Sequence, residues 1–331
     1  MKEKLLEVKD LSVAFKYNGK FLPQTRDVSF DIYKGEILGL VGESGSGKSV
    51  TSKALMQLLP TSGSKVLSGQ AIFEGEDLLR YPRKQMYNIR GNKISMIFQE
   101  PMTSLNPVYT CGNQIQEAIM LHQDLNKKEA RAKAIEMMEL VGIPLPESRV
   151  DNYPHEMSGG MRQRVMIAMA LSCAPKLLIA DEPTTALDPT IQAQIMDLLK
   201  SLQRKTGMSV LYISHDLGVI AEICDRVAVM YAGTIMEIAN VHELFYAPLH
   251  PYTIGLLNSM PRMDSTSDRL DSIEGTVPHF SNMPQGCPFA PRCKYATDQC
   301  RTGELPPMRS FDGHSVRCWN AEIRKGEPVN A

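Results

Sequence analysis

A glycine-rich stretch near the N-terminus restricts the fold of this chain more than any other part of its sequence. The stretch GESGSGKS, residues 42–49, fits the pattern G-x-x-x-x-G-K-[ST] of a phosphate-binding loop. It follows an apolar run typical of a buried strand and precedes apolar residues at helical spacing. Such a loop presents backbone amides and a helix N-terminus to phosphate oxygens. The pattern therefore predicts a nucleotide site, with Lys48 on the β- and γ-phosphates and the Ser49 hydroxyl on Mg²⁺.

A second predicted strand ends in two carboxylates. The run KLLIADEP is apolar up to Asp181 and Glu182. An Asp at the end of a strand beside a phosphate loop is suited to hold Mg²⁺, and a Glu after it can polarise an attacking water. An isolated Asp-Glu pair is more often a solvated strand end, but together with the phosphate loop it predicts nucleotide hydrolysis.

Between these two elements the residues Ser158, Gly159 and Gly160 open a predicted helix, where exposed backbone amides form a second anion site. With this motif the chain resembles the ATP-binding subunit of an ABC transporter over about its first 240 residues. The resemblance departs at one point, because the family's commoner signature ends in Gln where Met161 stands here.

The resemblance implies further roles. Gln99 matches the Q-loop, Asp188 ends the D-loop motif TALD, and His215 matches the switch histidine. Phe15 falls where the family stacks an aromatic ring on adenine, with Tyr17 as the weaker substitute. Catalysis is thus assigned to Glu182, His215 and Gln99, and Mg²⁺ to Ser49, Gln99 and Asp181. Nucleotide binding is assigned to Phe15, Gly42, Glu43, Ser44, Gly45, Ser46, Gly47, Lys48, Ser49, Gln99, Ser158, Gly159, Gly160, Asp181 and Asp188.

The expected fold class is α/β, a P-loop NTPase of the ABC nucleotide-binding type with a mainly parallel sheet. Residues of about 106–173 are expected to form an inserted helical subdomain, and Ala232-Gly233 to join two strands in a hairpin. The composition becomes rich in Pro, Ser, Asp and Gly near residue 250. We therefore predict an ATPase domain over 1–249 and a C-terminal extension with a four-cysteine motif over 250–331.

The C-terminal region narrows the resemblance. HPYTIGLLNSMP, residues 250–261, followed by CPFAPRC, is similar to the corresponding region of dipeptide/oligopeptide importer ATPases. This implies an ATPase that energises peptide import, with a second, related ATPase subunit, two membrane permease subunits and an extracytoplasmic peptide-binding protein. The same role for a related solute such as nickel stays open.

Two other classes are disfavoured. A soluble ABC ATPase acting on nucleic acid or ribosomes is expected to carry long coiled coils or two cassettes, and the net charge of −1 offers no attraction for nucleic acid. A phosphate-loop kinase is expected to lack the SGG helix and the switch histidine. The N-terminus has no apolar core of a signal peptide, and no apolar run reaches the roughly 20 residues of a membrane span. We expect a peripheral protein on the cytoplasmic face of the cell membrane.

Four of the seven cysteines, Cys287, Cys293, Cys300 and Cys318, gather in the extension. Disulfides are rare in a reducing cytoplasm. Structural zinc sites usually take ligands from tight C-x-x-C pairs, which are missing here. An iron–sulfur cluster accepts four cysteines at irregular spacing, and a loop-rich segment gains a staple from it. The similar motif of peptide-importer ATPases favours the same choice. The sequence therefore predicts a [4Fe–4S] cluster, with Zn²⁺ as the alternative, in addition to ATP and Mg²⁺.

Overall fold

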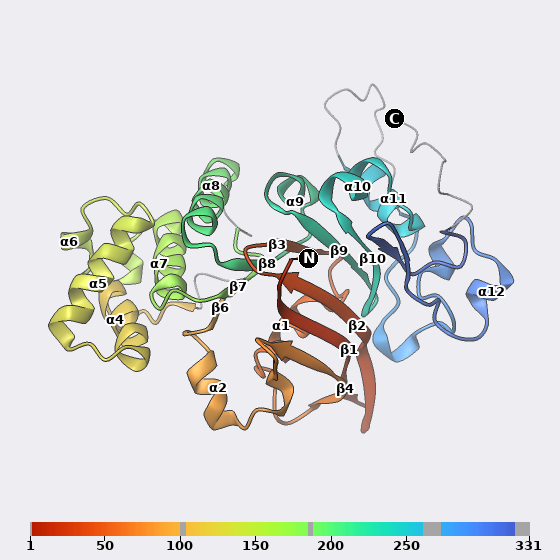
Figure 1. The fold of residues 1–331 in the computed structure, drawn as a ribbon, viewed down its shortest axis with the longest axis horizontal. Coiled ribbons are helices and arrows are strands. Elements are labelled where there is room, and N and C mark those ends of the chain that lie inside the picture. Colours follow the sequence, from red (N-terminus) through yellow and green to blue (C-terminus); the bar gives the residue numbers. More distant parts are fainter. Residues whose placement is uncertain (1, 100–103, 185–187, 261–272, 322–331) are drawn as a thin grey trace. The chain divides into compact units, whose positions relative to one another are not determined.

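The structure is a computed structural model that describes residues 2–99, 104–184, 188–260 and 273–321 (Figure 1). The chain forms two compact units. Unit 1 consists of residues 1–3, 33–36 and 80–212, and unit 2 of residues 4–32, 37–79 and 213–331.

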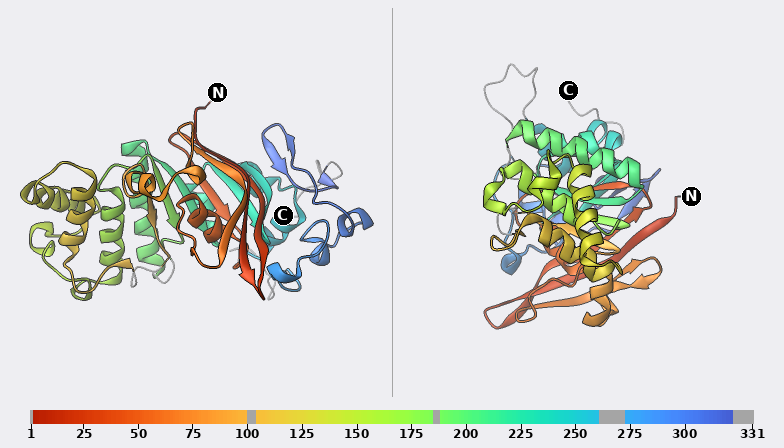
Figure 2. Two further views of the ribbon diagram at one scale, coloured as in Figure 1. Left: turned by 90° about the horizontal axis from the view of Figure 1, so that it is seen from below. Right: turned by 90° about the vertical axis from the view of Figure 1, so that its left-hand side faces the viewer.

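Unit 1 is mostly helical. Three of its helices, α4, α5 and α7, pack against one another (Figures 1 and 2). Asn126 begins α5 with a capping box, in which its side chain accepts from the Glu129 amide and the Glu129 carboxylate accepts from the Asn126 amide. The helices of unit 1 are α2 (Arg83–Ile89), α4 (Cys111–His122), α5 (Lys127–Leu140), α6 (Pro146–Arg149), η2 (Pro154–Glu156), α7 (Gly159–Leu171) and α8 (Pro189–Thr206).

Helix α8 shows how local sequence sets an element's ends. The Asp188 carboxylate accepts from the Ile191 amide, Pro189 occupies the first turn, and Gly207 ends the helix in the left-handed region at φ 69°. Apolar residues at helical spacing form its buried face: Ile195, Met196, Leu199 and Leu202.

The strands of unit 1 are short and buried. β6 (Ile94–Ile97) and β7 (Leu177–Asp181) pair in parallel, with Ile94 opposite Leu177. All five residues of β7 are buried, as expected for a strand covered on both faces. β8 (Ser209–Ser214), whose last two residues belong to unit 2, is likewise fully buried and ends directly before His215.

Unit 2 contains an antiparallel sheet with the strand order β2-β1-β4-β5 (Figure 2). These strands are β1 (Lys4–Tyr17), β2 (Lys20–Tyr33), β4 (Ser64–Phe73) and β5 (Glu76–Asp77). A second group contains β3 (Ile37–Val41), β9 (Arg226–Tyr231) and β10 (Thr234–Asn240), where β3 and β9 pair in parallel and β9 and β10 pair antiparallel. The predicted hairpin is confirmed, because Ala232 and Gly233 have φ 45° and 84° and connect β9 to β10.

The helices of unit 2 are short: η1 (Leu78–Arg80), whose last residue lies in unit 1, α1 (Lys48–Leu55), α9 (Leu217–Ile223), α10 (Val241–Tyr246), α11 (Pro251–Asn258), η3 (Phe280–Asn282), η4 (Ala290–Arg292) and α12 (Asp298–Arg301). The last two strands, β11 (Arg309–Phe311) and β12 (His314–Val316), extend the hairpin, because β12 pairs with β10. The buried Glu237 carboxylate of β10 accepts from the amides of Leu249 and His250 and contacts His314 Nε2 at 2.6 Å. This carboxylate joins the C-terminal segment to the sheet.

The alternation of parallel strands with helices confirms the predicted α/β fold class, and antiparallel strands are added at the edges. Helices α4 to α7 occupy the stretch in which helices were predicted. Within the described parts of the chain, no helix is both long enough and apolar enough to cross a bilayer.

Candidate functional site

The phosphate loop lies between β3 and α1 in unit 2, as the sequence predicts. Gly42, Gly45 and Gly47 have φ values of 153°, 79° and 104°. At Gly42 a side chain is also excluded by space, since a Cβ there would lie 2.0 Å from the Met230 carbonyl oxygen. The glycines thus let the loop wrap tightly, with its backbone exposed for a ligand.

Lys48 begins α1 and its ammonium group turns back onto the loop. Its Nζ donates to the carbonyl oxygens of Gly42 at 2.7 Å and Glu43 at 3.1 Å, and the residue is only 5% exposed. The buried Ser46 hydroxyl has no hydrogen-bond partner among the described residues. A glycine cradle, a buried cation and an orphaned hydroxyl together fit a phosphate ligand, and Ser49 follows Lys48 in the first turn of α1.

The two aromatic candidates for adenine lie on β1 in unit 2. Phe15 is half-buried and pairs with Ser64 of β4. Tyr17 is 41% exposed, and its ring centroid lies 5.7 Å from that of His279 and 5.8 Å from that of Phe280. Of the two residues, Tyr17 is the more exposed, but its ring already contacts two other aromatic rings.

Unit 1 contains the carboxylates. Asp181 ends β7 and is 2% exposed. Glu182 follows with φ 49°, a left-handed conformation that non-glycine residues rarely adopt and that is frequent at functional sites. The Gln99 amide Nε2 donates to Glu182 Oε2 at 3.0 Å. The structure therefore brings together two of the three predicted catalytic side chains.

The signature motif also lies in unit 1. The Ser158 hydroxyl caps α7 by accepting from the Met161 amide at 3.3 Å, and Gly159 and Gly160 form the first turn. The Ser158 and Gly159 positions are exposed, so the amide-rich end of α7 is open to a ligand. At Gly160 a Cβ would lie 2.9 Å from Ile191 Cγ2 of α8, which explains the second glycine.

The remaining predicted residues sit at element ends. Asp188 caps α8, while residues 185–187 of the D-loop motif lie outside the described residues. His215 is exposed directly after β8 and belongs to unit 2, together with the phosphate loop. The Asp216 carboxylate next to it caps α9 through the amides of Gly218 and Val219.

Sequence reasoning missed three residues that contact the predicted site. Gln163, fully buried in α7, donates to the Pro183 carbonyl oxygen directly after Glu182. Arg292 and Tyr252 of the C-terminal segment both contact Glu43 of the phosphate loop. The sequence marks both positions, because Arg292 lies inside CPFAPRC and Tyr252 inside HPY. Neither residue type, however, identifies Glu43 as the partner.

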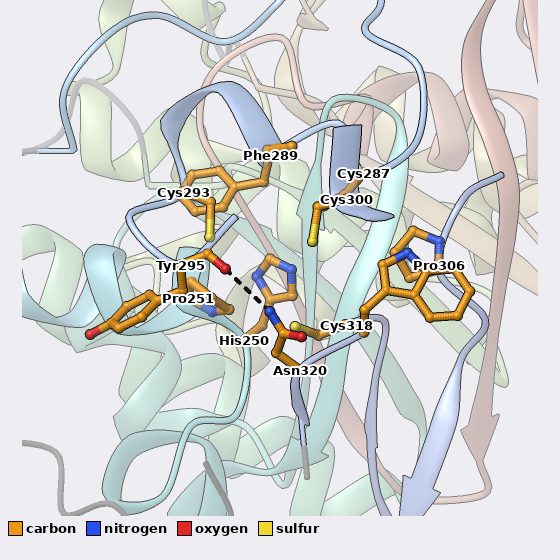
Figure 3. A pocket seen from close by; sticks show the side chains of 12 residues that line it. His250, Pro251, Cys287, Phe289, Cys293, Tyr295, Cys300, Pro306, Cys318 and Asn320 are labelled. Atoms are coloured by element: carbon orange, nitrogen blue, oxygen red, sulfur yellow. Dashed lines mark hydrogen bonds between the residues drawn. The ribbon is translucent and has the colours of Figure 1, made fainter. Parts of the chain in front are cut away.

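The four clustered cysteines line one cavity in unit 2 (Figure 3). All are free thiols, and all but Cys293 are buried. Burial raises the pKa of the Cys287 thiol to about 12. The cavity also has His250, Phe289, Tyr295 and Trp319 in its walls. Asn320, which also lines the cavity, donates from Nδ2 to the Tyr295 carbonyl oxygen at 3.2 Å.

The cavity can be compared with the two predicted metal centres, a zinc ion and an iron–sulfur cluster. Among the described residues, no three His, Cys, Asp or Glu side chains are grouped so that they could hold a metal ion. This weighs against zinc, which needs four donors within about 2.3 Å of one point, and it gives no support to the predicted iron–sulfur cluster. A cluster takes each thiolate on a separate iron, so its ligands surround a space instead of a point. The four cysteines match a cluster in number, but the space of about 10 Å³ accommodates only about one water, so the cavity as it stands does not hold a cluster.

Two known families match different parts of the chain. Residues 25–185 match the ABC transporter family, and residues 236–300 match the C-terminal region of oligopeptide/dipeptide transporters. The chain is 53% identical to the oligopeptide transport ATP-binding protein OppD of Bacillus subtilis over 99% of this chain and 92% of that protein. It is 54% identical to the dipeptide transport ATP-binding protein DppD of the same organism over 99% and 98%.

Solved structures give the same fold. The ATP-binding cassette MJ0796, in a dimeric post-hydrolysis state bound to ADP and Pi, matches with a TM-score of 0.64 at 26% identity, over 71% of this chain and 98% of that one. CbiO1 from Clostridium perfringens, part of the ABC transporter complex cbiONQ, matches with a TM-score of 0.63 at 28% identity, over 74% and 91%.

Proposed function

The chain belongs to the ATP-binding subunits of oligopeptide and dipeptide ABC transporters, and from this premise we propose that it hydrolyses ATP to energise peptide import. One observation carries the proposal: an ABC ATPase match and a peptide-transporter C-terminal match occur together in a single chain. The ATPase match alone fits any ABC system, whereas the second match is to the C-terminal region described for oligopeptide/dipeptide transporters.

ATP binding is assigned to the loop and its flanking residues. The amides of Gly42–Ser49 and the Lys48 ammonium hold the phosphates, and Phe15 stacks on adenine. Ser49, Gln99 and Asp181 would hold Mg²⁺, which would neutralise charge on the phosphate oxygens. Support comes from the glycine cradle and the buried cation of Lys48.

Hydrolysis is assigned to Glu182 as general base. Its carboxylate accepts the proton of the attacking water, while the hydrogen bond from Gln99 holds it in one orientation. His215 is assigned to the γ-phosphate as a hydrogen-bond donor, by its match to the switch histidine.

The signature residues Ser158, Gly159 and Gly160, with Asp188, act on the ATP of a second ATPase subunit in this proposal. The exposed end of α7 supports such an intermolecular role. We propose that the second subunit is a related but different chain. The solved structures of the MJ0796 cassette are dimeric.

We further propose that the chain docks on two membrane permease subunits at the cytoplasmic face of the cell membrane. An extracytoplasmic binding protein then delivers the peptide to the permeases. We also propose that the chain consists of an ATPase domain over 1–249 and a C-terminal extension over 250–331. The ATPase domain contains the helical subdomain at about 106–173.

A [4Fe–4S] cluster on Cys287, Cys293, Cys300 and Cys318 completes the proposal. Support comes from the convergence of four free thiols on one cavity. In this role the thiols of the extension act as thiolates that join its loops. Anaerobic purification should give about four iron and four sulfide per chain. A colourless anaerobic protein with one zinc per chain contradicts the cluster.

The transport role is tested by uptake. Cells lacking this chain should lose uptake of labelled di- and oligopeptides, and wild-type chain but not Lys48→Ala should restore it. Unchanged peptide uptake together with lost nickel uptake contradicts the peptide assignment.

A further inference from the structure

Arg292 of the C-terminal segment contacts the phosphate loop through a fixed guanidinium group. Its Nη1 lies 3.0 and 3.2 Å from the two Glu43 carboxylate oxygens and 3.3 Å from the Tyr231 hydroxyl. Nη2 donates to the Ile273 carbonyl at 3.1 Å and Nε to the Glu274 carbonyl at 2.8 Å. The side chain is 6% exposed. All three nitrogens are engaged, so the arginine holds one geometry that a lysine cannot reproduce.

Tyr252 contacts the backbone of the same loop residue. It is fully buried in α11, and its hydroxyl oxygen accepts from the Glu43 amide at 3.0 Å. Burial raises the pKa of this hydroxyl, so it stays neutral at physiological pH. Glu43 is thereby held at its side chain by Arg292 and at its backbone by Tyr252.

The position of Glu43 affects the groups that bind phosphate. The Glu43 carbonyl accepts from Lys48 Nζ at 3.1 Å and from the Ser46 amide at 3.1 Å. A loop that is already fixed loses less conformational entropy when it binds a ligand. We propose that Arg292 and Tyr252 are positioning residues that preorganise the phosphate loop for ATP through Glu43. The inference rests on the ATP-binding role proposed above.

The same residues connect the loop to the cysteine cavity. Phe289 lines this cavity (Figure 3). Its ring centroid lies 5.2 Å from that of Tyr231 and 5.4 Å from that of Tyr252. His250, another wall residue, accepts the Tyr252 amide on Nδ1 at 3.0 Å. The residues that hold Glu43 therefore pack directly against two residues in the wall of the cavity.

The test measures the Kd of Mg·ATP for the full chain by calorimetry. Tyr252→Phe removes only the hydroxyl, and Arg292→Met removes the charge at similar length. Each should weaken binding by about three- to tenfold, the effect of losing one or two hydrogen bonds. Arg301→Met is the matched control, because Arg301 is an exposed arginine on α12 of the same segment. It should bind ATP like wild type.

A double-mutant cycle separates positioning from a general loss of structure. Arg292→Met combined with Glu43→Gln should bind no more weakly than the weaker single variant, because both remove the same contact. Full additivity, or wild-type Kd in Tyr252→Phe and Arg292→Met, overturns the inference. If Arg292→Met does not fold, Tyr252→Phe decides alone. Failure of the wild-type chain to bind ATP contradicts the proposed function instead, and is recognised by equal results for wild type and Lys48→Ala.

Discussion

The phosphate loop and the cysteine cavity lie in the same unit, yet they present their polar groups in opposite ways. The loop offers backbone amides, whose positions are fixed by glycines with positive φ values. At Gly42 there is also no space for a side chain. The cavity offers side chains from four separate positions, linked mainly by turns and short helices. The backbone conformation of the loop thus fixes its polar groups, whereas those of the cavity come from side chains at positions distant in sequence.

Charge reinforces this difference. The loop already holds the buried ammonium group of Lys48 on its own carbonyl oxygens. In the cavity, burial raises the pKa of Cys287, so this thiol stays neutral until a cation stabilises the thiolate. We therefore expect changes in the loop to abolish ATP turnover and changes in the cavity to modulate it.

Among changes in the loop and the cavity, the largest effect on ATP binding is expected for Lys48→Ala. Loss of charged hydrogen bonds to phosphate, at about 1.5–3 kcal/mol each, should weaken Mg·ATP binding by about 100-fold or more. Lys53→Ala, one turn further along α1, is the control and should bind like wild type. Calorimetric Kd values check this. A Kd for Lys48→Ala within threefold of the wild-type value contradicts the expected role of the loop.

A smaller effect is expected for the double variant Cys287→Ser and Cys300→Ser. In the proposed cluster these thiols bind iron, so iron should be lost from the anaerobic protein, while ATP hydrolysis by the assembled complex should fall by less than about tenfold, because the groups proposed for hydrolysis are other residues. Iron analysis and a phosphate-release assay check both parts. If this double variant loses as much hydrolysis as Lys48→Ala, the cavity is essential for ATP turnover, and the expected difference between loop and cavity is wrong.

The smallest effect concerns thiol reactivity in chelator-treated protein. Because the pKa of Cys287 is raised to about 12, its thiolate is about one part in ten thousand at pH 8. Iodoacetamide should modify Cys287 slowly, with a rate that rises about tenfold per pH unit between pH 7 and 10. Mass spectrometry of the peptides measures this rate. Rapid, pH-independent labelling contradicts a buried neutral thiol.

The predictable parts of the molecule share a physical origin. The phosphate loop, the Asp188 cap and the Ala232-Gly233 hairpin depend on residues adjacent in sequence, whose backbone preferences act locally. For the same reason the fold class and the positions of the motifs at strand and helix ends followed from the sequence.

The unpredicted parts depend on contacts between distant positions. Arg292 and Glu43 are 249 residues apart, and Gln163 reaches Pro183 across 20 residues. A single sequence contains no signal for such pairs, because burial and partner choice arise only when the elements pack. The space among the four cysteines is also invisible in their spacing, which left zinc and a cluster as alternatives.

The central claim is that this chain hydrolyses ATP with Glu182 as the general base, and the isosteric variant Glu182→Gln tests it most directly. The measurement compares phosphate release and ATP binding of wild type and variant in the complex with its partner subunits. Removing a general base should lower hydrolysis by about 10²–10⁴-fold, while the groups that hold the phosphates keep the Kd of ATP unchanged. Hydrolysis by Glu182→Gln at the wild-type rate would contradict the account.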